Sequence, residues 1–259
     1  MTDRPIRIGV QLQPQHADYS AIRDAVLRAE DAGVDVIFNW DHFFPLRGNP
    51  DGKHFECWTM LGAWAEQTER VEIGALVSGI GYRNPDLLAD MARTVDHISG
   101  GRLILGLGAG WFEKDYDQFG YEFGTAGSRI ASLGDAMPRI KARLAAGNPA
   151  PSREIPVLIG GGGVRKTLRI VAEHADIWHS FGDLPTLTSK SAILDEHGAA
   201  VGRDTAALVE RSVEAKGAPG TTGEAFVAAG VTLFTVGVTG PDYDLSTVTD
   251  WVAWRDSRG

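Results

Sequence analysis

The feature that most constrains this chain is a regular alternation along its whole length. Short runs of β-branched residues alternate with segments of helical period, and eight such strand–helix units can be counted. The predicted strands are Ile6–Leu12, Val34–Trp40, Val71–Val77, Leu103–Leu107, Pro156–Ile159, Asp176–Ser180, Leu208–Ala215 and Val231–Val238. Eight strands, each followed by a helix, is the count of an α/β fold of the (β/α)8 or TIM barrel type. We therefore expect one barrel domain over residues 1–259.

The segments between these strands support the same fold. Apolar residues recur at helical spacing in the predicted helices, which are Asp18–Gly33, Glu56–Arg70, Pro85–Ile98, Arg129–Ala146, Val164–His174, Leu187–Val201, Gly223–Ala229 and Leu245–Trp254. Residues 112–127 are rich in glycine, aromatic and acidic residues and are predicted to form a loop. The alternative is a doubly wound open sheet, which carries phosphate-binding glycines after its first strand. Here the first strand runs into Gln13-Pro14-Gln15, so the barrel is favoured.

Charge and cysteine content exclude several classes of function. The net charge is −9, which argues against a nucleic-acid partner, because such binding needs a basic surface. Cys57 is the single cysteine, which excludes an intrachain disulfide and suits a reducing compartment. No apolar run approaches the ~20 residues of a membrane span, and the first residues lack a signal-peptide pattern. We expect a cytoplasmic protein that has no membrane partner and no metal site.

Glycines after the fifth strand are the first candidate ligand site. Gly160 to Gly163 stand in a row and are followed by Arg165 and Lys166 at the start of a predicted helix. Glycines let the backbone approach a ligand closely, and a helix N-terminus presents free N–H groups to an anion. Gly161, Gly162, Gly163 and Arg165 are therefore predicted to bind a phosphate. A flexible turn without a ligand remains the alternative.

Three further strand ends carry candidate residues, because function in a barrel collects where the strands end. Gly108-Ala109-Gly110 follows the fourth strand and could let a flat ligand lie against the backbone. Ser78-Gly79 follows the third strand and could form a bulge. Asp41-His42 follows the second strand, where a histidine can transfer a proton near neutral pH. Asp41 and His42 are the predicted catalytic residues.

Taken in barrel order, these segments resemble the bacterial luciferase-like family, in particular its oxidoreductases that depend on the deazaflavin coenzyme F420. The resemblance covers essentially the whole chain. It includes Arg83-Asn84-Pro85, the run Ser99-Gly100-Gly101-Arg102, and Ala172-Glu173-His174-Ala175-Asp176 besides the strand ends already named. It implies a barrel that holds a flavin-like ring in its mouth, bound by Ser78, Gly79, Gly108, Ala109 and Gly110, with the cofactor phosphate at Gly161, Gly162 and Gly163 and Arg165 beside it. Ser78-Gly79 would correspond to the family's bulge with a non-proline cis peptide.

The resemblance implies an activity and leaves alternatives open. The expected activity is hydride transfer between coenzyme F420 and a small organic substrate. An FMN-dependent monooxygenase shares the glycine and bulge features, and a cofactor-binding barrel without catalytic activity is a third reading. The chain departs from the sugar-phosphate dehydrogenases of the family, because Trp111 stands where they carry a catalytic glutamate. That departure puts glucose 6-phosphate in doubt as the substrate.

The family also implies a homodimer formed through helices on the outside of the barrel. Trp58 and Trp64 lie on the helix predicted over Glu56–Arg70, and they are the candidate contacts for such a dimer. The remaining features, among them Ser99 to Arg102, Asp96 and Glu113, are predicted to be structural.

Overall fold

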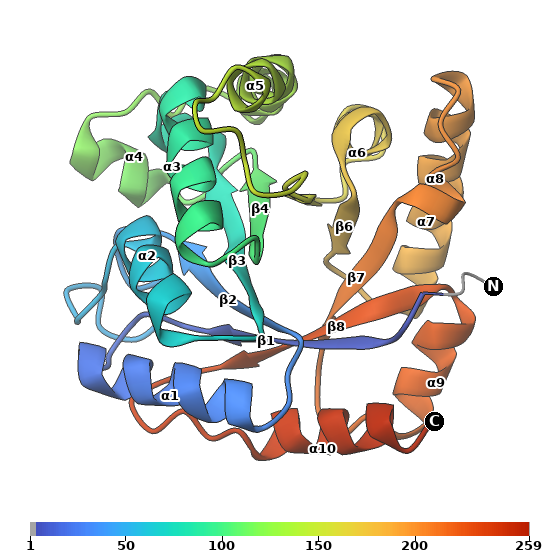
Figure 1. Cartoon of the computed structure of the whole chain (residues 1–259). Coiled ribbons are helices and arrows are strands. Elements are labelled where there is room, and N and C mark those ends of the chain that lie inside the picture. Colours follow the sequence, from blue (N-terminus) through green and yellow to red (C-terminus); the bar gives the residue numbers. More distant parts are fainter. Residues whose placement is uncertain (1–3, 259) are drawn as a thin grey trace.

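The computed structural model describes residues 4–258 and shows a closed barrel of parallel strands in sequence order, β1 to β8. The strands are β1 Arg7–Leu12, β2 Val36–Asp41, β3 Glu72–Gly79, β4 Leu103–Gly108, β5 Val157–Gly160, β6 Ile177–Ser180, β7 Glu210–Ala215 and β8 Val231–Val238. β1 pairs with both β2 and β8, which closes the ring (Figure 1). The predicted fold is therefore confirmed.

Helices surround the barrel and connect its strands (Figure 1). They are α1 Tyr19–Asp31, α2 Cys57–Gln67, α3 Pro85–Ile98, α4 Glu113–Phe119, α5 Ala126–Ala145, α6 Thr167–His174, α7 Leu184–Ala200, α8 Thr205–Leu208, α9 Gly220–Ala228 and α10 Ser246–Asp256, with a 3-10 turn at Ile80–Tyr82. α4 lies inside the stretch predicted as a loop, and the prediction there was wrong. Glu113 and Asp115 stand in its first turn and Gly120 ends it with a φ of 69°, signals that fit a short helix.

The core has two parts. A layer of apolar side chains fills the barrel interior, and it consists of Val36, Phe38, Leu76, Ile104, Leu158, Ile177 and Leu233. The larger part lies between the sheet and the helices. Trp58 and Trp64 belong to this larger part and are 3% and 0% exposed, so they cannot form a surface for a second copy. A homodimer stays a prediction, without those two residues as its contacts.

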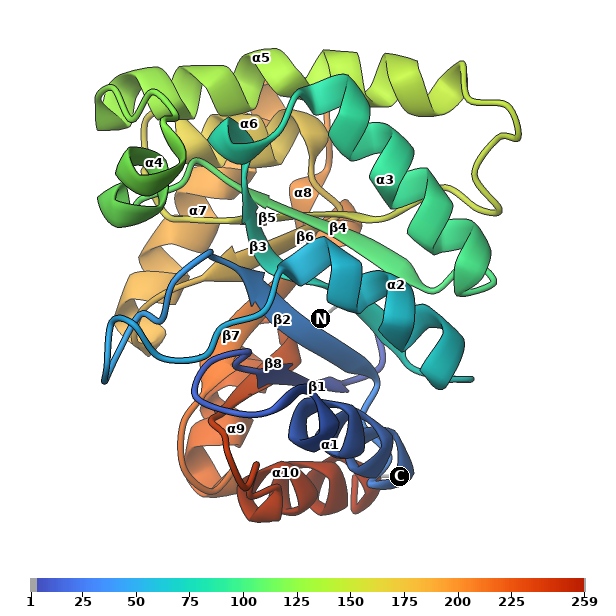
Figure 2. The ribbon, with the colours of Figure 1, turned by 90° about the vertical axis from the view of Figure 1, so that its left-hand side faces the viewer.

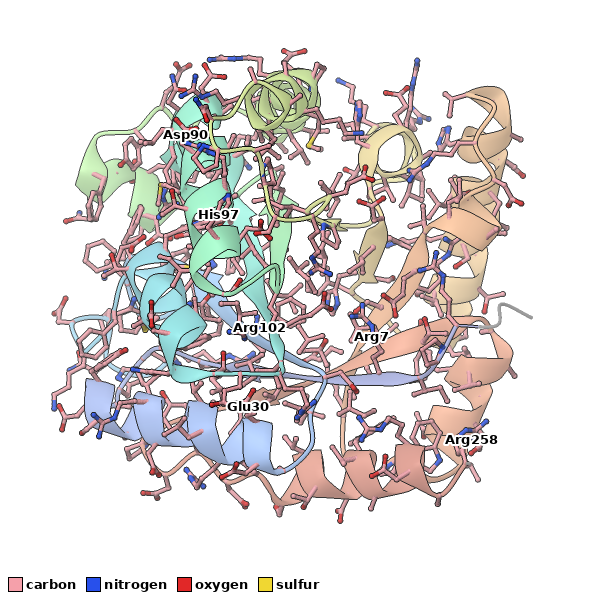
Figure 3. All side chains as sticks on the ribbon, in the orientation of Figure 1. Arg7, Glu30, Asp90, His97, Arg102 and Arg258 are labelled. Atoms are coloured by element: carbon pink, nitrogen blue, oxygen red, sulfur yellow. The ribbon has the colours of Figure 1, made fainter. Side chains whose placement is uncertain are left out.

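Ionic groups close the end of the barrel at which the strands begin. Arg7 of β1 is ion-paired with Glu72 of β3 and with Glu210 of β7, strands that lie on either side of β1 but do not touch it. Arg153 pairs with Glu72 from the loop before β5. Figure 3 shows Arg7 at this central position. These ion pairs join strands from opposite sides of the ring at this end of the barrel.

Arg102 anchors the segment that leads from α2 into β3. Its guanidinium donates to the carbonyls of Ala65, Thr68 and Val71 and to the hydroxyl of Thr68. Glu30 holds the same segment from α1, because its carboxylate accepts the backbone N–H groups of residues 69 to 71 (Figure 3). The structural role predicted for the run Ser99 to Arg102 is confirmed.

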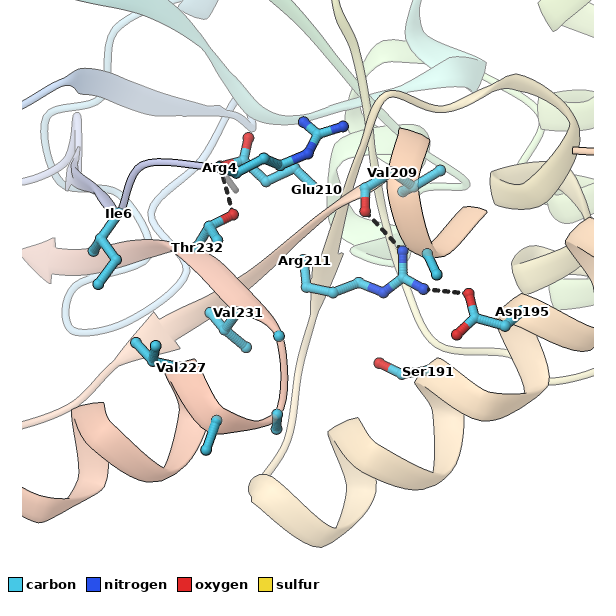
Figure 4. A pocket seen from close by; sticks show the side chains of 14 residues that line it. Arg4, Ile6, Ser191, Asp195, Val209, Glu210, Arg211, Val227, Val231 and Thr232 are labelled. Atoms are coloured by element: carbon cyan, nitrogen blue, oxygen red, sulfur yellow. Dashed lines mark hydrogen bonds and ion pairs between the residues drawn. The ribbon is translucent and has the colours of Figure 1, made fainter. Parts of the chain in front are cut away.

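A cavity of about 450 Å³ lies between α7, α9 and the beginnings of β7 and β8. Figure 4 shows Arg211 at its centre, bonded to Asp195 and to the carbonyl of Val209, while Thr232 donates to Glu210. The charged side chains in this cavity thus satisfy one another. It sits at the end of the barrel where the strands begin, which serves stability in this fold. Catalytic residues of such barrels lie at the opposite end, where the strands end.

Candidate active site

A cavity of about 490 Å³ opens where the strands end. Residues from the ends of β1 to β6 line it, namely Gln11, Trp40, Asp41, His42, Leu46, Leu76, Val77, Gly79, Tyr82, Gly108, Ala109, Gly110, Trp111, Gly160, Gly161 and Phe181. Figure 2 shows α4 and the loop after β2 on the same side of the molecule, beside this mouth. The walls are mostly apolar, which suits the ring of a flat ligand.

His42 is the residue best placed for proton transfer. Its Nδ1 lies 2.7 Å from Oδ2 of Asp115, and the side chain of Asp115 is fully buried. A carboxylate that accepts from Nδ1–H leaves Nε2 as the nitrogen available for proton exchange, and His42 lines the cavity. Trp40, Trp111 and Phe112 pack edge-on around the imidazole, with ring centroids 5.6 to 6.1 Å away. The ring is therefore fixed in place.

Asp115 is held in turn by two other donors. The hydroxyl of Tyr82 donates to Oδ2 at 2.9 Å, and the backbone N–H of Phe43 donates to Oδ1 at 3.1 Å. Burial, together with the adjacent carboxylate of Asp115, raises the pKa of Tyr82, so the phenol keeps its proton and remains a donor. These bonds fix the carboxylate that orients His42, an arrangement typical of general acid–base sites.

Asp41 lies at the same strand end but has a different partner. It forms a two-pronged ion pair with Arg83, at 2.5 and 3.1 Å, and Arg83 also binds Glu56 at 2.5 Å. Burial raises the pKa of Asp41, while the Arg83 guanidinium acts against that shift. Asp41 lines the cavity, but its carboxylate bonds to Arg83 and not to His42; the acid beside the histidine is Asp115.

The bulge in β3 lies earlier than the sequence suggested. The register with β4 shifts between Gly74 and Ser78, and the non-proline cis peptide is Leu76–Val77. The placement at Ser78-Gly79 was wrong, because Ser78 has already resumed pairing, with Leu107 of β4 and Asp41 of β2. Ser78 is fully buried and accepts a hydrogen bond from Trp58, whereas Gly79 lines the cavity.

The glycines of β4 make room for this bulge. A Cβ at Gly106 would lie 1.8 Å from the carbonyl oxygen of Ala75, and one at Gly108 would lie 2.6 Å from the side chain of Val77. A Cβ at Gly160 of β5 would also lie close to the side chain of Val77, at 3.1 Å. Val77 can therefore stand in the floor of the cavity. Ala109 and Gly110 complete the wall beside it.

The glycine run after β5 offers fewer free N–H groups than its sequence suggests. Gly161 donates to the carbonyl of His179, and its own carbonyl accepts from the indole of Trp178. Among residues 4–258, no protein acceptor takes the N–H groups of Gly162 and Gly163. A Cβ at Gly162 would lie 2.5 Å from Nζ of Lys190, which places a cation beside the run. Arg165 is exposed and does not line the cavity.

Two other histidines near the mouth, the half-buried His54 and the buried His179, are uncharged at neutral pH. Burial lowers the pKa of His54 to about 4, and Nε2 of this ring accepts the indole N–H of Trp40. Burial also lowers the pKa of His179 to about 4, and its Nδ1 lies 2.9 Å from the hydroxyl of Ser212. His179 does not line the cavity, so its contribution is to stability.

His179 predicts a pH dependence of stability. An unfolded chain protonates this histidine near pH 6.5 and the folded chain only near pH 4, so stability falls as the pH drops through that window. His179→Asn should reduce the loss of unfolding free energy between pH 6.5 and pH 4.5 by about 2–3 kcal/mol. Urea unfolding at both pH values measures this, with exposed His97→Asn as the control. An equal loss in the His179 variant and the parent chain would contradict the assignment.

Neither a metal site nor a membrane span is found within the described part of the chain. No group of three His, Cys, Asp or Glu side chains in residues 4–258 is arranged to hold a metal ion. Within the same residues, no helix combines the length and the apolar character needed to cross a bilayer.

The sequence of this chain is similar to those of known proteins. A sequence model of the luciferase-like monooxygenase family matches residues 4–228. An F420-dependent glucose-6-phosphate dehydrogenase of Amycolatopsis mediterranei is 27% identical over 236 residues, which are 82% of this chain and 68% of that protein. An enzyme of the same name from Intrasporangium calvum is 33% identical over 106 residues, which are 40% of this chain and 31% of that protein. The second match thus spans less than a third of its relative.

Solved structures share the fold at low sequence identity. An F420-dependent secondary alcohol dehydrogenase, in complex with an F420–acetone adduct, superposes with a TM-score of 0.82 at 17% identity, covering 95% of this chain and 97% of that one. The coenzyme F420 dependent tetrahydromethanopterin reductase of Methanopyrus kandleri has a TM-score of 0.75 at 16% identity, with 97% and 98% covered. A type II Baeyer–Villiger monooxygenase of Pseudomonas putida, in complex with FMN, has a TM-score of 0.65 at 14% identity, with 82% and 67% covered.

Proposed function

The chain belongs to the luciferase-like monooxygenase family, and from that premise we propose that it is an oxidoreductase that uses coenzyme F420 bound in the mouth of the barrel. The cofactor would carry hydride to or from a small organic substrate. The observation that carries the proposal is His42 in the wall of an apolar cavity, bonded through Nδ1 to Asp115, which Tyr82 holds in turn. The names of the sequence relatives support the choice of cofactor.

The residues of the cavity fit a deazaflavin. A flat ring can rest on Val77, because the glycines of β4 and β5 leave this side chain in the floor. The free N–H groups of Gly162 and Gly163, with Lys190 beside them, suit the cofactor phosphate. When bound, the deazaflavin would supply a hydride at one ring carbon and would not activate oxygen.

The protein's own part in the reaction is proton transfer and exclusion of water. Reduction of a substrate leaves negative charge on an atom, and His42 can neutralise it by donating a proton from Nε2. Asp115 stabilises the charged imidazole and keeps its orientation, while Tyr82 and the N–H of Phe43 hold Asp115. The rings of Trp40 and Phe112 shield this pair from solvent.

The cofactor assignment predicts a binding preference. Titration of the cofactor-free protein, followed by fluorescence, should show tighter binding of F420 than of FMN. Lys190→Met should weaken F420 binding by about 5- to 30-fold and leave a deazaflavin riboside without phosphate unaffected, because a partly buried charge near a phosphate contributes roughly 1–2 kcal/mol. Exposed Lys141→Met is the matched control. Tighter binding of FMN would instead support an FMN-dependent monooxygenase, and no binding of either would contradict both.

A further inference from the structure

Within residues 4–258, the wall of the active-site cavity contains neither lysine nor arginine. Among the described residues that line it, the ionisable side chains are Asp41, His42 and Tyr82. Asp41 is already paired with Arg83, whose guanidinium spans Asp41 and Glu56. A negatively charged substrate would therefore meet neither lysine nor arginine in this wall, and a protonated His42 is already paired with the carboxylate of Asp115. A buried anion without a partner is strongly disfavoured.

Three cations near the mouth do not line the cavity. Arg129 donates to the carbonyls of Gly110, Phe123 and Gly124 and lies over the ring of Phe123, 3.8 Å from its centroid. Lys114 donates to the carbonyl of Pro50 and lies over the ring of Phe44. Lys190 stands at the glycine run after β5, on the side assigned above to the cofactor phosphate.

Two exposed aromatic side chains form part of the rim of the cavity. Trp111, after β4, is 63% exposed, and Phe181, after β6, is 56% exposed, although both line the cavity. Trp40 and Leu46 extend the apolar wall below Trp111. Large apolar side chains left exposed at a pocket are typical of a surface that a ligand covers.

We propose, on the basis of the function proposed above, that the substrate is an uncharged carbonyl compound with a flat apolar group, or the corresponding alcohol. The flat group packs against Trp111 and Phe181, and a phosphorylated or carboxylated substrate is excluded. In the reduction, the bound cofactor would supply a hydride to the carbonyl carbon. The electron pair of the C=O π bond would move to oxygen, and His42 would donate the proton that completes the alcohol. Oxidised deazaflavin is the other product.

The test compares two compounds that differ in charge. Acetophenone and 4-acetylbenzoate share the aryl ketone, and the second adds a carboxylate. Isothermal titration calorimetry on the cofactor-free protein and on the F420-loaded protein should show at least tenfold tighter binding of acetophenone. Turnover with reduced F420 should show the same order. Trp111→Ala should weaken acetophenone binding at least fivefold, whereas Phe119→Ala, a 52% exposed aromatic that does not line the cavity, should leave it unchanged.

A charge introduced at the rim provides the converse experiment. Trp111→Arg should raise the affinity for 4-acetylbenzoate above that for acetophenone, because it supplies the missing cation. Equal or tighter binding of 4-acetylbenzoate, or of glucose 6-phosphate, by the parent chain would overturn the inference. Such a result with normal F420 binding would leave the proposed cofactor standing. Failure to bind F420 would contradict the proposed function, while calorimetry on the cofactor-free protein would still decide the charge preference of the cavity.

Discussion

His42→Gln should lower turnover by about 10²–10⁴-fold while leaving the affinity for F420 within a few-fold of the parent value. Glutamine is close to histidine in size but cannot give up a proton at neutral pH, so the substitution removes proton transfer and keeps most of the packing. Steady-state kinetics with reduced F420 and the best neutral ketone give kcat and KM. Fluorescence titration gives cofactor affinity independently. Exposed His97→Gln is the matched control and should behave as the parent chain does.

Asp115→Asn separates a positioning role from a catalytic one. Asparagine can still bond to Nδ1 but cannot stabilise a charged imidazole, so kcat should fall, by less than in His42→Gln, and its pH profile should move. A structural role alone would change thermal stability without moving that profile. Full turnover by His42→Gln would show that His42 lines the cavity without transferring a proton. Lost cofactor binding in the same variant would instead make it a ligand of the ring.

The fold was predictable from the sequence because its signal is local and repeated. Each strand–helix unit carries its own period, and β8 was predicted with the bounds that the structure shows. Most errors concern element ends, for example β2, which begins at Val36 and not at Val34. The short helices α4 and α8 were missed, since four to seven residues are too few to show a period.

The candidate site was predictable only in part, because its partners are distant in sequence. The position of His42 at a strand end pointed to the mouth of the barrel, but the neighbouring Asp41 drew attention away from Asp115, which lies 73 positions further along. Asp115 stood in a segment predicted as a loop, so the sequence could not predict the direction of its side chain. The bulge was placed two residues too late, because the shift in register is visible only when β4 is paired with β3.

Gly106→Ala tests whether the alternate glycines of β4 exist to accommodate that bulge. The new Cβ would lie 1.8 Å from the carbonyl oxygen of Ala75, a backbone atom that cannot rotate away. Overpacking against side chains usually costs about 1–3 kcal/mol, and a clash with backbone should cost roughly 3–5 kcal/mol. Thermal and urea unfolding measure the loss. Because Ala75 precedes Leu76 and Val77 in the floor of the cavity, F420 affinity should fall in the same variant.

Gly62→Ala is the control that separates this clash from the general effect of replacing glycine. Gly62 lies within α2, and a Cβ there would meet no atom within 4 Å. Alanine in the middle of a helix is favoured over glycine by about 0.5–1 kcal/mol, so this variant should be slightly more stable and should bind F420 normally. A loss of stability in Gly106→Ala and a gain in Gly62→Ala would show that β3 occupies the space beside Gly106. If Gly106→Ala folds with parent stability and affinity, the bulge adapts to β4 and the glycine is not what positions the floor of the cavity.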